Sequence, residues 1–119
     1  MFPKPISPII FAVGYTRGSI EFLDFETTGL DYQNDRIIEV AAIKFVDGEI
    51  TERYVELVNP EKTIPTVITE ITGISNSMVR TSPSEEFIID DLLSFIGNDP
   101  LVGHNIQFDK NFLNQLCKR

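Results

Sequence analysis

The sequence is poor in cysteine and has no long apolar run. Cys117 is the only cysteine, which excludes an intrachain disulfide and a cysteine-rich zinc site and gives no reason to expect export. The longest apolar stretch near the N-terminus, residues 9–13, is too short to span a membrane and follows three prolines. These absences favour a cytoplasmic protein with no membrane partner.

Basic residues are also scarce. The 10 Lys and Arg residues against 18 Asp and Glu residues give a formal net charge of −8 at pH 7. An acidic protein gains little from counterion release on a phosphate backbone, so broad binding to duplex nucleic acid is not expected. A small site that holds one strand end, with metal ions offsetting the charge, is compatible with this composition.

Size and composition fit one globular domain. The 119 residues are 42% hydrophobic and 24% charged, which allows a single core and excludes a disordered chain. Residues 1–19 contain three prolines and two glycines without periodicity, and we predict that they form a leader. The domain proper is predicted over residues 20–119.

Three strands are expected in the first half of the domain. They cover residues 20–26, 36–45 and 50–57, each rich in β-branched or aromatic residues. The last two are joined by Asp47-Gly48, the dipeptide that favours a two-residue hairpin turn. The sheet is therefore predicted to begin with antiparallel strands.

Helices and one further strand are expected in the second half. A short helical piece ends at Gly73, and a capping box at residues 82–85 begins a longer helix that ends at Gly97. A buried strand at 101–103 and a helix at 108–116 follow. The order β-β-β-α-β-α predicts an α/β fold with a mixed sheet covered by helices.

Two acidic residues lie at the end of the first expected strand. Asp24 and Glu26 are two positions apart, so their side chains project from the same face. Two like charges beside an apolar strand are costly unless a cation offsets them, and hard divalent ions such as Mg²⁺ bind carboxylate oxygens. The alternative is that both acids end the strand and point into solvent.

A second polar block, residues 104–109, lies where the strand at 101–103 passes into the last helix. Open sheets usually place their sites at such a junction. Asp109 has mostly apolar neighbours, so it does not lie on an obviously solvated face. The alternative is that Asn105 caps the helix and Asp109 is an acid of the first turn, favoured by the helix dipole.

Together these two blocks resemble a known family. FLDFETTGL (residues 22–30) and LVGHNIQFDKNFL (residues 101–113) are similar to the first and second motifs of the DnaQ-like 3′→5′ exonucleases. These are the proofreading exonucleases of bacterial replicative polymerases, with RNase T and helicase-linked relatives. VNP, ITGIS and TSP match between the two blocks in the same order. The resemblance covers about residues 20–117 and implies a ribonuclease-H-like fold.

The resemblance also implies a catalytic site with two metal ions, Mg²⁺ or Mn²⁺. Asp24 and Glu26 would hold the metals, with Asp24 bridging both ions, and Asp109 would be the third acid. Thr27 and Leu30 would contact the terminal nucleotide of the substrate. The remaining substrate-binding residue implied by the resemblance is Phe108. For Leu30 and Phe108 the alternative is ordinary packing in the core.

The family's third motif is missing from this sequence. In the family, that motif carries a general-base histidine five residues before a fourth aspartate, on a further helix. The one histidine here, His104, belongs to the second motif, where a structural role is expected. The fold is therefore predicted to be truncated before its last strand and helix, leaving an uncovered apolar face that favours a homo-oligomer.

The leading hypothesis is a partial exonuclease domain at residues 20–119, metal-dependent, acting on single-stranded DNA or RNA 3′ ends, and weakly active or inactive alone. The alternative is a catalytically silent remnant that still binds a strand end or a polymerase or helicase segment. A third hypothesis, a haloacid-dehalogenase-like phosphatase suggested by residues 24–28, leaves the second block unexplained.

Overall fold

The structure, a computed structural model, describes residues 18–119. Residues 1–17 of the predicted leader lie outside the described residues, and Ser19 already begins the first strand. In the described part of the chain, no helix is both long and apolar enough to cross a membrane.

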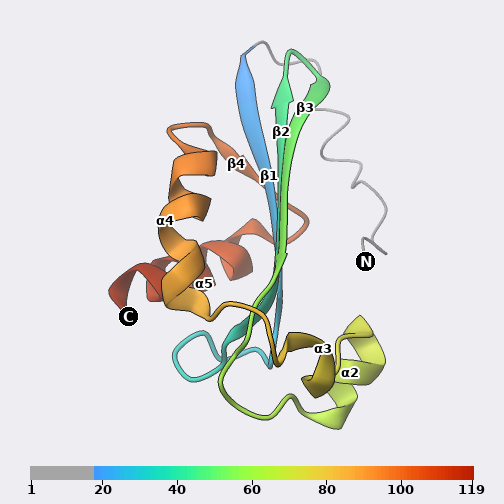
Figure 1. Cartoon of the computed structure of the whole chain (residues 1–119). Helices are drawn as coiled ribbons and strands as arrows, with labels where there is room; N and C mark the ends of the chain where they lie inside the picture. Colours follow the sequence, from blue (N-terminus) through green and yellow to red (C-terminus); the bar gives the residue numbers. More distant parts are fainter. Residues whose placement is uncertain (1–17) are drawn as a thin grey trace.

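One four-stranded sheet organises the domain (Figure 1). The strands lie in the order β3-β2-β1-β4. β1 and β2 are antiparallel, as are β2 and β3, whereas β4 is parallel to β1. The predicted mixed sheet with an antiparallel start is therefore confirmed. The strands are β1 (Ser19–Thr27), β2 (Ile37–Val46), β3 (Glu49–Leu57) and β4 (Leu101–Val102).

The β2–β3 hairpin turns at the dipeptide expected from the sequence. Asp47 and Gly48 have φ angles of 52° and 85°, the left-handed conformation that both central residues of the favoured hairpin turn require. Val46 and Glu49 pair directly across this turn. Local turn chemistry thus sets the register of the two strands.

Four helices complete the described fold. α4 and α5 lie on one side of the sheet, and α2 and α3 lie together at one end of it (Figure 1). α2 ends at Gly73, as expected, where a φ of 78° lets the Gly73 N–H donate to the Thr69 carbonyl. α3 was not predicted from the sequence. The helices are α2 (Thr66–Thr72), α3 (Asn76–Val79), α4 (Glu85–Ile96) and α5 (Ile106–Lys118).

The start of α4 differs from the prediction. The helix begins at Glu85 after Ser84, whose side chain makes no capping bond, so the capping box expected at residues 82–85 is wrong. The Asn59 N–H donates to the Pro83 carbonyl, and Asn59 and Ser84 form a parallel bridge. This contact holds residues 82–84 extended. The Glu85 side chain contacts residues distant in the sequence and does not cap the N-terminus of its own helix.

The strand β1 has two different faces. Leu23 and Phe25 are buried and pack in the main core, whereas Asp24 and Glu26 are half-buried on the opposite face. The alternation follows from the two-residue period of a strand. The helices contribute to the same core the side chains of Ile88, Leu92, Ile96, Phe112, Leu113 and Leu116.

A buried carboxyl lies near the beginning of β1. The Glu21 side chain is fully buried, and the Lys44 Nζ lies 3.8 Å from its Oε2 and 3.1 Å from Asp99 Oδ2. These distances make ion pairs, but among the described residues neither Glu21 oxygen receives an aligned hydrogen bond. Burial, reinforced by the neighbouring Asp99 carboxyl, with which only a protonated Glu21 could share a hydrogen bond, raises the pKa of Glu21 from 4.5 to about 7, against the opposing pull of Lys44.

We therefore expect Glu21→Gln to change how stability depends on pH. The raised pKa means that the native state binds the Glu21 proton more tightly than the unfolded state. The free energy of unfolding should fall as pH rises from 4.5 to about 7, by roughly 3 kcal/mol, and level off above. In Glu21→Gln this fall should be missing. Urea unfolding across this pH range measures it, with exposed Glu49→Gln as the control. An unchanged pH profile would contradict the raised pKa.

Candidate functional site

The two sequence blocks meet because β4 pairs with β1. Glu21 is paired with Leu101 and Phe22 with Val102, after which the chain leaves the sheet and enters α5. Asn105 is the N-cap of α5, and its side chain accepts a bond from the Phe108 N–H at 3.5 Å. The predicted capping role of Asn105 is thus correct.

Asp109 is more than a first-turn acid of this helix. Its side chain lies against the edge of β1, where its Oδ1 accepts a hydrogen bond from the Phe25 N–H at 3.0 Å. Asp109 is 2% exposed. The contact joins residues 84 positions apart, beyond the point where β4 stops pairing with β1. Asp109 therefore continues the hydrogen bonding of β1 next to Asp24.

Gly103 makes this close approach sterically feasible. A Cβ atom at Gly103 would lie 2.8 Å from the Leu23 carbonyl oxygen and 3.4 Å from Asp109 Oδ2. The first distance is to backbone, which cannot move aside cheaply. Any larger residue would push the start of α5, and with it Asp109, away from β1.

One pocket collects all of the candidate site residues. It has a volume of about 300 Å³ and lies between the C-terminal part of β1, the start of α5 and the helix α2. The lining includes the three acids and the three substrate-binding candidates, which are Asp24, Glu26, Asp109, Thr27, Leu30 and Phe108. Tertiary structure thus brings together residues that the sequence holds in two separate blocks.

The carboxylates of this pocket have the donor chemistry of a Mg²⁺ or Mn²⁺ site, since hard divalent ions bind oxygen ligands. Asp24 and Glu26 come from the same face of β1, and Asp109 approaches from α5. Within residues 18–119, however, no three His, Cys, Asp or Glu side chains form a ready-made metal shell. The three residues therefore have the oxygen donors that a divalent metal prefers, but their side chains are not grouped closely enough to form a complete coordination shell.

A further acid beside Asp24 and Glu26 was not predicted from the sequence. Glu39 on β2 is the direct cross-strand partner of Glu26 and is 5% exposed. Partners in an antiparallel register lie on the same face of the sheet, so the two side chains are neighbours. The signal was present in the strand at 36–45, where an acid interrupts an apolar run.

The substrate-binding candidates have distinct environments. The Thr27 hydroxyl donates to the Gly29 carbonyl at 2.6 Å and so braces the turn after β1. Leu30 is 85% exposed, which excludes the alternative of core packing. Phe108 is partly buried against the core, with its ring 4.9 Å from that of Phe112, and it also lines the pocket.

Two apolar residues of α2 complete the pocket and were not predicted. Ile71 is 74% exposed, and Ile68 is half-buried. Both line the same pocket as Leu30, on an element with no fully buried residue. Ile68 also packs against the buried cluster around Ile38 and Ile64, whereas the exposed Ile71 leaves an apolar patch beside the pocket, a feature typical of binding surfaces. His104 also lines the pocket and is exposed, so it is not a packed core histidine.

Comparisons with known proteins agree with the motifs. A family model described as Exonuclease, of the RNase T type, matches residues 22–119. A DNA polymerase III of the PolC type from Thermotoga petrophila is 38% identical over 118 residues, which is 96% of this chain and 9% of that protein. The DNA polymerase III subunit epsilon from Aquifex aeolicus is 35% identical over 102 residues, 86% of this chain and 50% of that subunit. This chain thus spans half or less of these relatives.

Solved structures share the fold. Exonuclease I in its apo form superposes with a TM-score of 0.76 at 22% identity, over 87% of this chain and 25% of that one. Exonuclease X, solved in complex with 5′ overhanging duplex DNA, superposes with a TM-score of 0.68 at 32% identity. That match covers 79% of this chain and 53% of exonuclease X. The predicted ribonuclease-H-like sheet is confirmed.

Proposed function

This chain belongs to the RNase T-type exonuclease family, and from that premise we propose that it is a metal-dependent 3′→5′ exonuclease domain of the proofreading type. The substrate we propose is the 3′ end of single-stranded DNA, since relatives of this chain are polypeptides of DNA polymerases. The observation that carries the proposal is the pocket in which Asp24, Glu26 and Asp109 lie beside the exposed Leu30.

The three acids would hold the metal ions. When bound, a pair of divalent ions supplies a water nucleophile and stabilises the attacking and leaving oxygens of the phosphodiester. Asp24 and Glu26 present their carboxylates from one face of a rigid central strand. The hydrogen bond from the Phe25 N–H orients Asp109 toward the same strand. These contacts would hold part of the ligand set in place before substrate arrives.

The apolar side of the pocket would hold the terminal nucleotide. Leu30 and Ile71, on two different elements, are both largely exposed. A base inserted between them would bury their side chains and would be held without reading its sequence. Such contacts suit an enzyme that removes any terminal nucleotide. They also localise binding to one strand end, which is compatible with a net charge of −8.

We expect slow or no turnover by the 119-residue chain alone. Its one histidine, His104, belongs to the second motif, so the general base expected of the family has no counterpart in this sequence. A positioned base contributes about 10²–10⁴-fold to rate. A 5′-labelled single-stranded oligonucleotide with Mn²⁺ measures the shortening of its 3′ end. Added imidazole should speed that shortening, and Asp24→Asn should abolish it.

The same assay separates the proposal from its alternative. A catalytically silent binding module would retain the oligonucleotide in a filter assay and leave it intact with or without imidazole. Shortening that persists in Asp24→Asn would place the chemistry elsewhere and contradict the proposed site.

The partner of such a domain would be a polymerase segment. The polymerase relatives carry the similar region within a much longer chain, of which this chain covers 9% in the Thermotoga petrophila protein. Replicative polymerases work in the bacterial cytoplasm, so we propose that compartment too.

Self-association is also expected, because the edge strand β3 exposes Ile50 and Val55, which are 38% and 41% exposed.

A further inference from the structure

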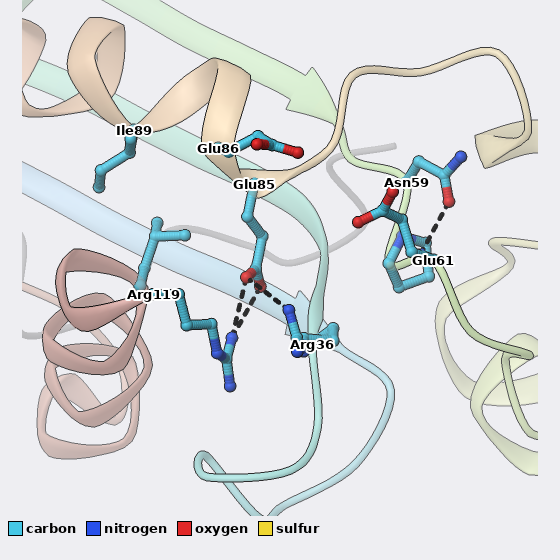
Figure 2. Close-up of a pocket in the computed structure, with 9 residues that line it drawn as sticks. Arg36, Asn59, Glu61, Glu85, Glu86, Ile89 and Arg119 are labelled. Carbon is cyan, nitrogen blue, oxygen red and sulfur yellow. Dashed lines mark hydrogen bonds and ion pairs between the residues drawn. The ribbon is translucent and has the colours of Figure 1, made fainter.

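A buried carboxylate joins three elements on the side of the sheet covered by α4 and α5. Glu85, the first residue of α4, is 6% exposed. Its Oε1 and Oε2 accept bonds from Arg119 Nη1 at 2.9 and 3.1 Å, and its Oε2 also accepts one from the Ile37 N–H at 3.1 Å. Arg36 Nη1 lies 3.5 Å from Oε1 (Figure 2). Glu85 thus ties α4 to α5 and to the start of β2.

The same arginine reaches from Glu85 to the loop between β1 and β2. Arg119 Nη2 donates to the carbonyl oxygens of Tyr32, Gln33 and Asp35 at 3.0, 3.3 and 3.2 Å. The Arg119 side chain is 17% exposed. A planar guanidinium can bond a carboxylate on one edge and carbonyl oxygens on another, which a lysine ammonium cannot reproduce. Arg119 therefore fixes the position of the loop relative to the helices.

The loop itself is closed by Asp35. Its Oδ1 accepts a bond from the Thr28 hydroxyl at 2.9 Å, and its Oδ2 accepts one from the Asp31 N–H at 3.0 Å. On the other side, Lys62 Nζ lies 3.6 Å from Asp35 Oδ1 and donates to the Asn34 carbonyl at 3.1 Å. Residues 28–35 are thus held in one shape.

Leu30 lies within this closed loop, between Thr28 and Asp31. It is 85% exposed yet lines the pocket of the three acids. Burial of its apolar surface would stabilise an exposed leucine, so a loose loop would be expected to fold it onto the protein. A network that prevents this collapse keeps the side chain available to a ligand.

We propose that the Arg119–Glu85 pair is a positioning device, which holds the loop of residues 28–35 so that Leu30 stays presented to the terminal nucleotide. The identity of the ligand, the terminal nucleotide, rests on the proposed exonuclease function. The holding of residues 28–35 by Arg119 and Glu85 does not depend on that function. Arg119 and Glu85 do not line the pocket of the acids, so they act through the loop and not through contact with substrate.

The first test measures the loop without substrate. In Arg119→Ala, hydrogen exchange of the Asn34 and Asp35 amides, which donate to the Asp31 carbonyl, should become at least about tenfold faster. The exposed Arg53→Ala on β3 removes the same charge and should leave both amides unchanged. Arg119→Lys keeps the charge beside Glu85 without the fork of donors and should give an intermediate rate. Unchanged exchange in all three variants would overturn the inference.

The second test measures the effect on binding. An oligonucleotide with 2-aminopurine at its 3′ end reports the dissociation constant without hydrolysis when metal is withheld. If Arg119→Ala leaves the loop in the presenting shape a tenth of the time, the dissociation constant should rise about tenfold. The same substitution in a Leu30→Ala background should have little effect, because the loop would have no leucine to present.

These outcomes separate the positioning device from the proposed exonuclease function. Faster loop exchange in a protein that never binds the oligonucleotide would reject the proposed function and keep the positioning device. If Arg119→Ala raised the dissociation constant by the same factor with and without Leu30, Arg119 would act through general stability. That result would overturn the positioning device. An unchanged dissociation constant of the oligonucleotide for the Arg119→Ala variant would also overturn the positioning device.

Discussion

Mn²⁺ or Mg²⁺ is expected to raise the melting temperature of this protein markedly, and Asp24→Asn is expected to abolish that rise. An ion that binds only the native state stabilises it by about 2.7 kcal/mol at a hundredfold excess over its dissociation constant. For a chain of this length that corresponds to a shift of about 10 °C. The reason is that metal binding would relieve the repulsion between carboxylates that share the pocket of Asp24, Glu26 and Asp109.

Thermal unfolding followed by circular dichroism measures this effect. Asp90→Asn, an exposed acid on α4 outside the pocket, removes one charge and should leave the shift intact. An equal shift in Asp24→Asn and in the unmodified protein would show that the ions bind elsewhere.

Substitutions of Asp109 should separate its structural role from its role as a ligand. Asp109→Ala leaves the buried Phe25 N–H without its partner, and we expect a loss of about 1–3 kcal/mol in the free energy of unfolding. Asp109→Asn retains an oxygen that can accept this bond but removes the negative charge. It should have nearly the same free energy of unfolding as the unmodified protein and show little stabilisation by Mn²⁺.

Urea unfolding of both variants, with and without Mn²⁺, measures the two roles. The neighbouring exposed Lys110→Ala on the same helix serves as the control, because it should change neither quantity. If Asp109→Asn retained the full response to Mn²⁺, Asp109 would be a structural residue and the site would depend on Asp24 and Glu26 alone.

The buried acids outside the pocket have a different function from those inside it. Glu85 accepts hydrogen bonds from Arg119, Ile37 and Arg36 and so connects α4 to α5 and to the start of β2. Glu21 is buried with weaker compensation from Lys44, which is why its pKa is raised. Each of these two single carboxylates is therefore met by a cationic side chain from a neighbouring element. The three acids that share one pocket are instead the residues that we propose as metal ligands.

Residue type and local spacing were enough to predict the strands, their hairpin and the helix ends at Gly73 and Gly97. Asp47-Gly48 encodes its turn because both residues tolerate positive φ, and Gly73 ends α2 for the same reason. The acids Asp24, Glu26 and Asp109 could be proposed because residue type and spacing, together with the resemblance to exonucleases, are properties of the linear chain. These signals act over a few residues and need no tertiary contact.

Contacts between side chains that are far apart in the sequence depended on the packing of the whole domain. The capping box at residues 82–85 failed because Glu85 bonds to Arg119, 34 residues away, and the bond from Phe25 to Asp109 spans 84 residues. The exposed Ile71 became part of the pocket only when α2 folded beside the end of β1. Strand order and helix placement fix such contacts, and they are settled by burial of the whole core, which no local pattern of residues specifies.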